Sequence, residues 1–227
     1  MIFITGDTHG WKDLDKLKKF NFKTQDELTK EDYVIILGDF GLLWNNSEEE
    51  RYWLDWLDSR NFTTLFVDGN HENFNLLYEY KLEEWNGGLV RYVKPTVLHL
   101  SRGQIFTIDN LKFFIMGGAS SIDKHYRTPN ISWWKEELPT DKEIITALAN
   151  LDNNNNNKVD YILTHTCSNR LVDKMGFKSD RDKLNNLFDL VENKIKYRHW
   201  YFGHFHKDFT FNDNKHTVLY NTVLQIN

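Results

Sequence analysis

The stretch Tyr201-Phe202-Gly203-His204-Phe205-His206 places two histidines two positions apart, directly after an apolar run and a glycine. Successive side chains of a strand point to opposite faces, so both imidazoles can serve one site only if the strand ends before them. Gly203 permits the chain to turn at that point. We therefore interpret residues 198–202 as a strand that leads His204 and His206 into a turn.

The same arrangement, a short apolar run followed by residue types that bind metals, occurs four more times upstream. The runs are residues 2–5, 33–37, 62–67 and 159–163. The polar residues that follow them are Asp7, His9, Asp39, Asn70, His71 and His165. Ligands of open α/β sheets bind beyond the carboxyl ends of the strands. If these strands are parallel neighbours, the six side chains converge with the two histidines of the last motif.

The composition is typical of a globular protein of ordinary size. The 227 residues are 40% hydrophobic and 27% charged, with a formal net charge of −5. We expect residues 1–227 to form a single domain, because this length suits one α/β unit. The chain shows no basic stripe, which disfavours a nucleic-acid partner without excluding one.

The cysteine content and the hydropathy pattern indicate a cytoplasmic protein. Cys167 is the single cysteine, so an internal disulfide is impossible and a reducing compartment is favoured. Asp7 and His9 interrupt the N-terminal apolar stretch before it is long enough for a signal peptide. No window approaches the roughly 18 apolar residues of a membrane span, so we expect no membrane partner. The oligomeric state is left open.

The first third of the chain alternates strands with helices. Helices are predicted over residues 12–20, from Ser47 onwards and over residues 74–80. Ser47 and Glu50 have the spacing of a capping box. This alternation favours a sheet with parallel pairs and right-handed crossovers.

The rest of the chain mixes antiparallel strands with two further helices. Asp109-Asn110 is typical of a hairpin turn between apolar runs. Thr140 and Glu143 predict a second capping box for a helix to Leu151, and another helix is predicted from Ser179 and Asp182. Surface loops are predicted over residues 120–130 and 153–157, and strands over residues 96–100, 104–108, 111–116, 208–211 and 216–223.

The residue types that follow the strands indicate two metals. Carboxylate oxygens and imidazole nitrogens suit Mn, Fe, Zn or Ni, and the ligands are too many for one tetrahedral site. Asp7 and Asp39 balance two of the four positive charges of two divalent ions. The remaining charge favours a hydroxide and an anionic ligand such as phosphate. Two metals about 3.5–4 Å apart clamp the attacking and leaving oxygens of an in-line displacement.

Five segments in order resemble the motifs of the calcineurin-like metallophosphoesterases, and in particular the small bacterial or phage-type members. The segments are Asp7-Thr8-His9, Gly38-Asp39, Gly69-Asn70-His71-Glu72, His165 and Gly203-His204-Phe205-His206. The resemblance implies an α/β, four-layer sandwich of two mixed β-sheets flanked by helices. It places the metal site at the carboxyl ends of the strands.

The resemblance also implies the ligands of two divalent metal ions, for which we expect Mn, with Fe, Zn or Ni as alternatives. The first ion would be held by Asp7, His9, Asp39 and His206. The second would be held by Asp39, which bridges the two, with Asn70, His165 and His204.

The reaction implied is hydrolysis of a phosphate mono- or diester by a metal-bridging hydroxide, with Asp39 and His71 as catalytic residues. His71, like Asn70, would contact the substrate phosphate, and it would protonate the leaving oxygen. An imidazole suits that role because it titrates near the operating pH. The expected partner is a small phosphorylated substrate or a nucleotide. The alternative is a catalytically silent scaffold of the same fold that binds a protein partner.

The chain departs from the protein-phosphatase branch after the second motif. The Asp–Arg–Gly continuation of that branch is replaced by Asp39-Phe40-Gly41, which makes a serine/threonine protein phosphatase a poorer expectation. The aspartate that would orient His71 is missing, and Glu72 is the nearest candidate to replace it. Asp68 is expected to cap a turn, with a role as a hydrogen-bond partner of a site residue as the alternative.

Arg127 is the candidate phosphate ligand outside the motifs, because a guanidinium binds phosphate with two parallel hydrogen bonds. It lies in the predicted loop over residues 120–130, and the alternative is a solvated surface arginine. Trp44, Trp133 and Trp134 are candidates for stacking against a substrate ring, with core packing as the alternative. His99, His125, His199 and His216 match no motif, so we expect them to be surface or structural residues.

Overall fold

The computed structural model describes residues 1–154, 157–178 and 180–226. Its first sheet has the strand order β13-β1-β2-β3-β6-β5-β4. The strands are β1 (Ile2–Thr5), β2 (Tyr33–Leu37), β3 (Thr63–Val67), β4 (Leu82–Trp85), β5 (Gly88–Lys94), β6 (Val97–Leu100) and β13 (Leu224–Gln225). β1, β2, β3 and β6 are parallel to their neighbours in that series, and β4, β5 and β13 add antiparallel edges.

The second sheet has the order β11-β12-β10-β9-β8-β7. Its strands are β7 (Gln104–Ile108), β8 (Leu111–Met116), β9 (Tyr161–Thr164), β10 (His199–Phe202), β11 (Phe209–Thr210) and β12 (His216–Val218). The four central strands are parallel, and β7 and β11 pair antiparallel at the two edges. Both sheets are therefore mixed.

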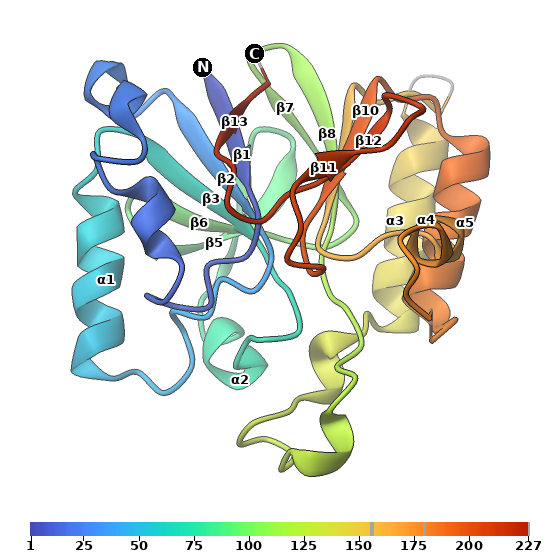
Figure 1. The fold of residues 1–227 in the computed structure, drawn as a ribbon, viewed down its shortest axis with the longest axis horizontal. Helices are drawn as coiled ribbons and strands as arrows, with labels where there is room; N and C mark the ends of the chain where they lie inside the picture. Colours follow the sequence, from blue (N-terminus) through green and yellow to red (C-terminus); the bar gives the residue numbers. More distant parts are fainter. Residues whose placement is uncertain (155–156, 179, 227) are drawn as a thin grey trace.

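The two sheets pack face to face with helices outside them (Figure 1). Between the sheets lies an apolar layer that includes Ile4, Ile35, Leu65, Ile115 and Leu163, all fully buried. The helices are α1 (Glu48–Asp58), α2 (Phe74–Leu77), α3 (Asp141–Asn153), α4 (Asn169–Lys174) and α5 (Lys183–Lys194). Short 3-10 helices span Leu14–Leu17, Lys23–Glu27, Lys124–Tyr126 and Lys135–Glu137. The prediction of a four-layer α/β sandwich is confirmed.

The burial of apolar side chains explains why α1 and α5 lie on the outer faces of the sheets. Leu54 and Leu57 of α1 pack into the cluster on the outer face of the first sheet, with Val34 and Phe66. Leu184, Leu187, Phe188 and Val191 of α5 pack with Trp200 on the outer face of the second sheet. In each helix the apolar residues are three or four positions apart, which is the spacing that lines one helical face.

The helix-start predictions are confirmed in part. Thr140 and Glu143 form a complete capping box. Ser47 caps α1 by accepting the Glu50 backbone N–H. The Glu50 carboxylate does not return to Ser47, because it accepts backbone N–H groups of residues 44–46 instead. Asp182 caps α5, whereas Ser179 lies outside the described residues.

The predicted helix over residues 12–20 is wrong beyond one 3-10 turn at Leu14–Leu17. A regular amphipathic helix would bury Phe20 with Leu14 and Leu17, but the Phe20 side chain is 86% exposed. Lys16 is buried instead, and its Nζ donates to the carbonyl oxygens of Gly6, Asp7 and Tyr220. This lysine therefore ties the end of β1 to the C-terminal segment.

Two other predictions need correction, and two features of the structure were not predicted. The predicted strand over residues 216–223 stops at Val218, and the chain then crosses to the first sheet as β13. The β4–β5 hairpin and α4 were not predicted. The loop predicted over residues 153–157 begins after α3 ends at Asn153, and residues 155 and 156 lie outside the described part. No helix of the described residues is both long and apolar enough to cross a membrane.

Candidate metal centre

The predicted ligands come together where the carboxyl ends of β1, β2 and β3 meet those of β9 and β10. Each ligand follows one of these strands in the chain. Four of them, His9, Asp39, His204 and His206, have left-handed backbone with φ of 44°, 46°, 68° and 48°. Such φ values are uncommon for residues other than glycine and cluster at functional sites. The turns aim the side chains away from the strands and into one centre.

Three overlapping groups of side chains could each hold a metal ion. They are Asp7, His9 and His206; His9, Asp39 and His71; and Asp39, His165 and His204. Within each group the candidate ligand atoms all lie within 4.8 Å of one another. Because the groups share His9 and Asp39, they form one connected centre.

Asp39 is the buried carboxylate at the middle of this centre. Its Oδ2 lies 3.4 Å from His9 Nε2, and its Oδ1 lies 3.2 Å from His165 Nε2. The two oxygens therefore face histidines of two different groups. Oδ1 also accepts the backbone N–H of His71 at 2.7 Å. That contact requires a glycine at position 69, because a Cβ there would lie 2.1 Å from Oδ1.

Asp7 is held in the same way from the other side. Its Oδ1 accepts the backbone N–H of His204 at 2.9 Å, and a Cβ on Gly203 would lie 2.3 Å from that oxygen. Asp7 Oδ2 is buried and, among the described residues, has no hydrogen-bond partner of good geometry. His206 Nε2 lies 3.2 Å from it. A buried oxygen without a hydrogen bond is costly, so this atom is suited to a cation.

Neighbouring groups orient the imidazoles and the amide. His165 Nδ1 donates to the Leu37 carbonyl at 2.8 Å, and His9 Nδ1 lies 2.7 Å from Asp13 Oδ2. In both rings Nε2 is left facing the centre, as in metal-binding histidines. Asn70 Nδ2 donates to Ser121, which leaves Asn70 Oδ1 3.2 Å from His165 Nε2.

The charges of the centre favour a cation. Burial alone would lower the pKa of His165, but the charges of Asp39 and Asp7 outweigh it and raise that pKa to about 10. Burial would raise the pKa of Asp39, but His165 and His9 lower it well below its usual value. Burial and the charge of His165 lower the pKa of His204 to about 4. The carboxylates that draw a proton to His165 would also attract a divalent ion.

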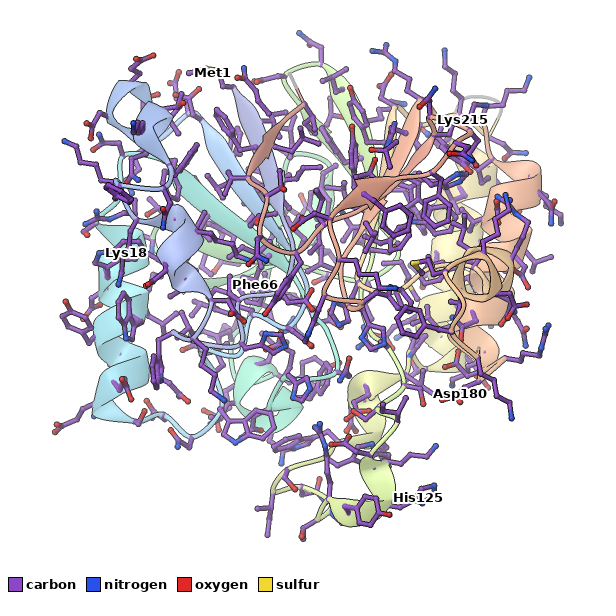
Figure 2. The ribbon with its side chains drawn as sticks, in the orientation of Figure 1. Met1, Lys18, Phe66, His125, Asp180 and Lys215 are labelled. Carbon is purple, nitrogen blue, oxygen red and sulfur yellow. The ribbon has the colours of Figure 1, made fainter. Side chains whose placement is uncertain are left out.

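His71 and Arg127 lie side by side at the edge of the centre. Arg127 Nη2 and Nη1 lie 3.3 and 3.4 Å from the two ring nitrogens of His71. Burial and the Arg127 charge lower the pKa of His71, against the opposing charge of Asp39. Arg127 belongs to the loop that extends below the sheets in Figure 1, and the labelled His125 in Figure 2 marks that loop. The structure thus places Arg127 at the centre, not out in solvent.

Two predictions about neighbouring carboxylates are wrong. Glu72 does not orient His71, because its carboxylate accepts the backbone N–H groups of Phe40 and Gly41. Burial and the charge of Asp39 raise the pKa of Glu72 to about 8. Asp68 is not a turn cap. It is buried and bonded to His99 at 2.9 Å and to Arg102 Nε at 2.7 Å.

Several residues at the centre were missed from the sequence. Asp13 lies four positions after His9, a spacing that could have suggested the contact. Tyr220, whose ring stacks on His206 at 4.6 Å between centroids, follows no motif and has no sequence signal. Among the tryptophans, Trp134 is 1% exposed and packs on Trp44. That burial excludes a stacking role for Trp134.

The comparisons with known proteins agree with this geometry. A model of the calcineurin-like phosphoesterase family matches residues 1–208. A lariat debranching enzyme of Entamoeba histolytica is 26% identical over 188 residues, which are 76% of this chain and 48% of that protein. The chain thus spans about half the length of this curated relative.

Two solved structures are also similar. A putative 5′-nucleotidase from Staphylococcus aureus has a TM-score of 0.54 at 13% identity, over 96% of this chain and 48% of that one. A phosphopantetheinyl hydrolase from Mycobacterium tuberculosis has a TM-score of 0.47 at 16% identity, over 97% and 89%. At such identities the first likeness shows the fold alone.

The fold and the connected centre agree with the match to the family model. The chain belongs to the calcineurin-like phosphoesterase family, since the family model covers most of its length. The resemblance inferred from the five motifs is therefore confirmed.

Proposed function

We propose that this protein hydrolyses a phosphate mono- or diester at a centre for two divalent ions, with Mn as the expected metal. The first ion would be held by Asp7, His9, Asp39 and His206, and the second by Asp39, Asn70, His165 and His204. The observation that carries the proposal is the position of Asp39, because its two oxygens face histidines of two different groups. When bound, such ions polarise a phosphoryl oxygen and make water a nucleophile near neutral pH.

The chain's own side chains supply binding and proton transfer. Arg127 presents guanidinium N–H groups next to His71, so a phosphate there would accept hydrogen bonds from both residues and from Asn70. His71 would donate its proton to the departing oxygen. Burial and Arg127 lower the pKa of His71, which makes the protonated imidazole a stronger acid. The backbone contact to Asp39 holds His71 in position.

The expected substrate is a small phosphorylated molecule or a nucleotide. The name of one similar protein, a lariat debranching enzyme, supports a nucleotide-like substrate. The formal charge of −5 argues against a long polyanion, since binding one depends on a basic surface.

The test is metal content and turnover measured on one preparation. The protein is stripped with a chelator and assayed on 4-nitrophenyl phosphate and bis(4-nitrophenyl) phosphate with Mn, Ni, Fe or Zn. Hydrolysis that requires added metal is expected, and Asp39→Asn should abolish it. The control Asp26→Asn changes an exposed carboxylate paired with Lys19 and should leave turnover intact. Metal binding without hydrolysis of any ester would favour the silent scaffold.

His71→Ala separates catalysis from metal binding. The variant should keep its metal and lose rate, by about 10²–10⁴-fold if His71 is the general acid. Loss of metal from this variant would contradict the assignment of His71, because it would make the residue a ligand.

A further inference from the structure

The metal centre lies between two cavities. The first has a volume of about 550 Å³ and its lining includes Arg127, Phe177 and Phe205. The second has a volume of about 590 Å³ and its lining includes Trp11 and Trp44. His71 and His206 line both cavities. The reacting atoms would therefore sit where two openings meet, not at the end of a blind pocket.

The position of the centre between two cavities suits a phosphodiester better than a phosphate monoester. A phosphate monoester carries one ester arm, so one cavity beside the centre is enough for it. A phosphodiester carries two arms that leave phosphorus in different directions, and each needs room. Both cavities fall within the range of about 300–1,000 Å³ that is usual for small-molecule sites. Each of them can hold an arm of considerable size.

Aromatic side chains with exposed rings line both cavities. In the first cavity, the Phe177 side chain is 40% exposed. The centroid of its ring lies 5.2 Å from that of the Phe205 ring and 4.5 Å from Lys207 Nζ. In the second, Trp11 is 47% exposed, and the half-buried Trp44 is held against buried Trp134 at 5.1 Å. Exposed rings beside a polar centre are suited to stacking against planar groups.

The charges around the cavities limit the size of the substrate. Besides Asp39 of the centre, the first cavity has Arg127 and Lys178 against three aspartates, at 123, 180 and 182. Asp180 of this lining is labelled in Figure 2, above the loop that carries His125. The second cavity has Lys12 against three carboxylates, at 13, 49 and 50. Neither can neutralise a row of phosphates, so a short substrate fits better than a polynucleotide.

We propose that the substrate is a phosphodiester with a planar ring in each arm, the chemical class of a dinucleoside phosphate. This proposal rests on the proposed function. One ring would stack on Phe177 and the other on Trp11. Water adds to phosphorus and one P–O ester bond breaks. One proton of the water remains on the new phosphate group until it ionises, and the other is released to solvent. The departing oxygen takes the proton of His71, which solvent then restores. The products are a phosphate monoester and an alcohol.

The experiment compares three esters that share one chromogenic leaving group. They are bis(4-nitrophenyl) phosphate, methyl 4-nitrophenyl phosphate and 4-nitrophenyl phosphate, each with the Mn-loaded protein. The readout is the ratio of kcat/KM for the diaryl diester to that for the methyl aryl diester. Intrinsic reactivity contributes equally to this ratio in every variant, so a change between variants reports ring binding. The ring of the leaving group is common to both diesters, so the variant that contacts the ring of the retained arm, either Trp11→Ala or Phe177→Ala, should lower the ratio at least about 5-fold, the lower end for loss of one stacked ring. The other variant should lower kcat/KM for both diesters by a similar factor.

The control is a substitution of an aromatic residue away from both cavities. Phe20→Ala removes an aromatic ring that is 86% exposed. Phe20 is not among the described residues that line either cavity, so the ratio should not change. If an alanine variant does not fold, Trp11→Leu or Phe177→Leu keeps apolar volume without the ring and should have the same effect as that alanine variant. A ratio that is unchanged in both folded variants overturns the inference, as does hydrolysis of the monoester alone. In both cases the proposed function stands, whereas it fails if no ester is hydrolysed with any metal.

Discussion

Replacing Arg102 by methionine is expected to destabilise the protein strongly, because it would leave the Asp68 carboxylate buried without its main partner. Asp68 is 1% exposed and Arg102 is 5% exposed. Arg102 Nε donates to Asp68 Oδ2 at 2.7 Å, and Nη2 also donates to the Glu136 carbonyl at 2.8 Å. The charge of Arg102 and the contact with His99 lower the pKa of Asp68 far below its usual range, against the effect of burial. The carboxylate is therefore ionised at neutral pH.

The magnitude follows from the cost of a buried, unpaired charge. Removing one partner of a buried ion pair typically costs about 3–5 kcal/mol. A domain of this size loses about 2–4 °C in Tm for each kcal/mol, so Arg102→Met should lower Tm by about 6–20 °C. The double variant Asp68→Asn/Arg102→Met removes both charges and should recover part of this loss. Such non-additivity is expected of residues in direct contact.

The assay is urea and thermal unfolding followed by circular dichroism, with a chelator present so that metal binding does not contribute to stability. The surface pair Lys19–Asp26, whose side chains are 73% and 51% exposed, provides the control. Lys19→Met should cost less than about 1 kcal/mol. If Arg102→Met costs no more than Lys19→Met, the argument from a buried charge is refuted. A double variant less stable than the single one would also contradict it.

Two further predictions concern metal affinity and pH. Asp13→Asn removes the carboxylate beside His9 Nδ1 and should weaken metal binding by about 10–100-fold. Titration with Mn of the apoprotein tests this, with exposed Asp15→Asn as the control, and equal affinities would contradict it. Burial and the charge of His216 lower the pKa of His199 to about 4. Its stabilising effect is therefore complete above about pH 6.5, the pKa of unfolded histidine, and is lost as the pH falls towards 4. Because solvent screening reduces the effect, we expect a loss of up to about 2 kcal/mol between pH 7 and 4, measured by urea unfolding. His199→Gln should flatten that dependence, and an unchanged slope would refute the assignment.

The amino-acid sequence was sufficient to predict the sandwich and the group of side chains that meets at its edge. Each motif is local, because an apolar run predicts a strand and the residues directly after it mark the strand's end. When parallel strands are neighbours, their carboxyl ends lie at the same edge. Three such ends belong to the first sheet and two to the second, and the packing of the two sheets brings their polar residues together. The family match and the fold agree with that reasoning, whereas the ligand roles and the metal remain predictions.

Partners that are distant in sequence could be found only in the tertiary structure. Glu72 binds backbone N–H groups of residues 40 and 41, and Asp68 pairs with a guanidinium 34 positions away. Lys16 is buried against Tyr220, about 200 positions away. No hydrophobic period and no fixed spacing in the sequence links the two partners of any of these contacts.

The same holds for the two cavities and for β13, which follows β12 of the second sheet in the chain but pairs with β1 of the first. The positions of the strands and the types of ligand that follow them can be recognised from neighbouring residues in the sequence and from the hydrophobic pattern. The choice among chemically similar partners follows from packing, because the free energy of a buried charge or an exposed ring depends on what the fold places beside it.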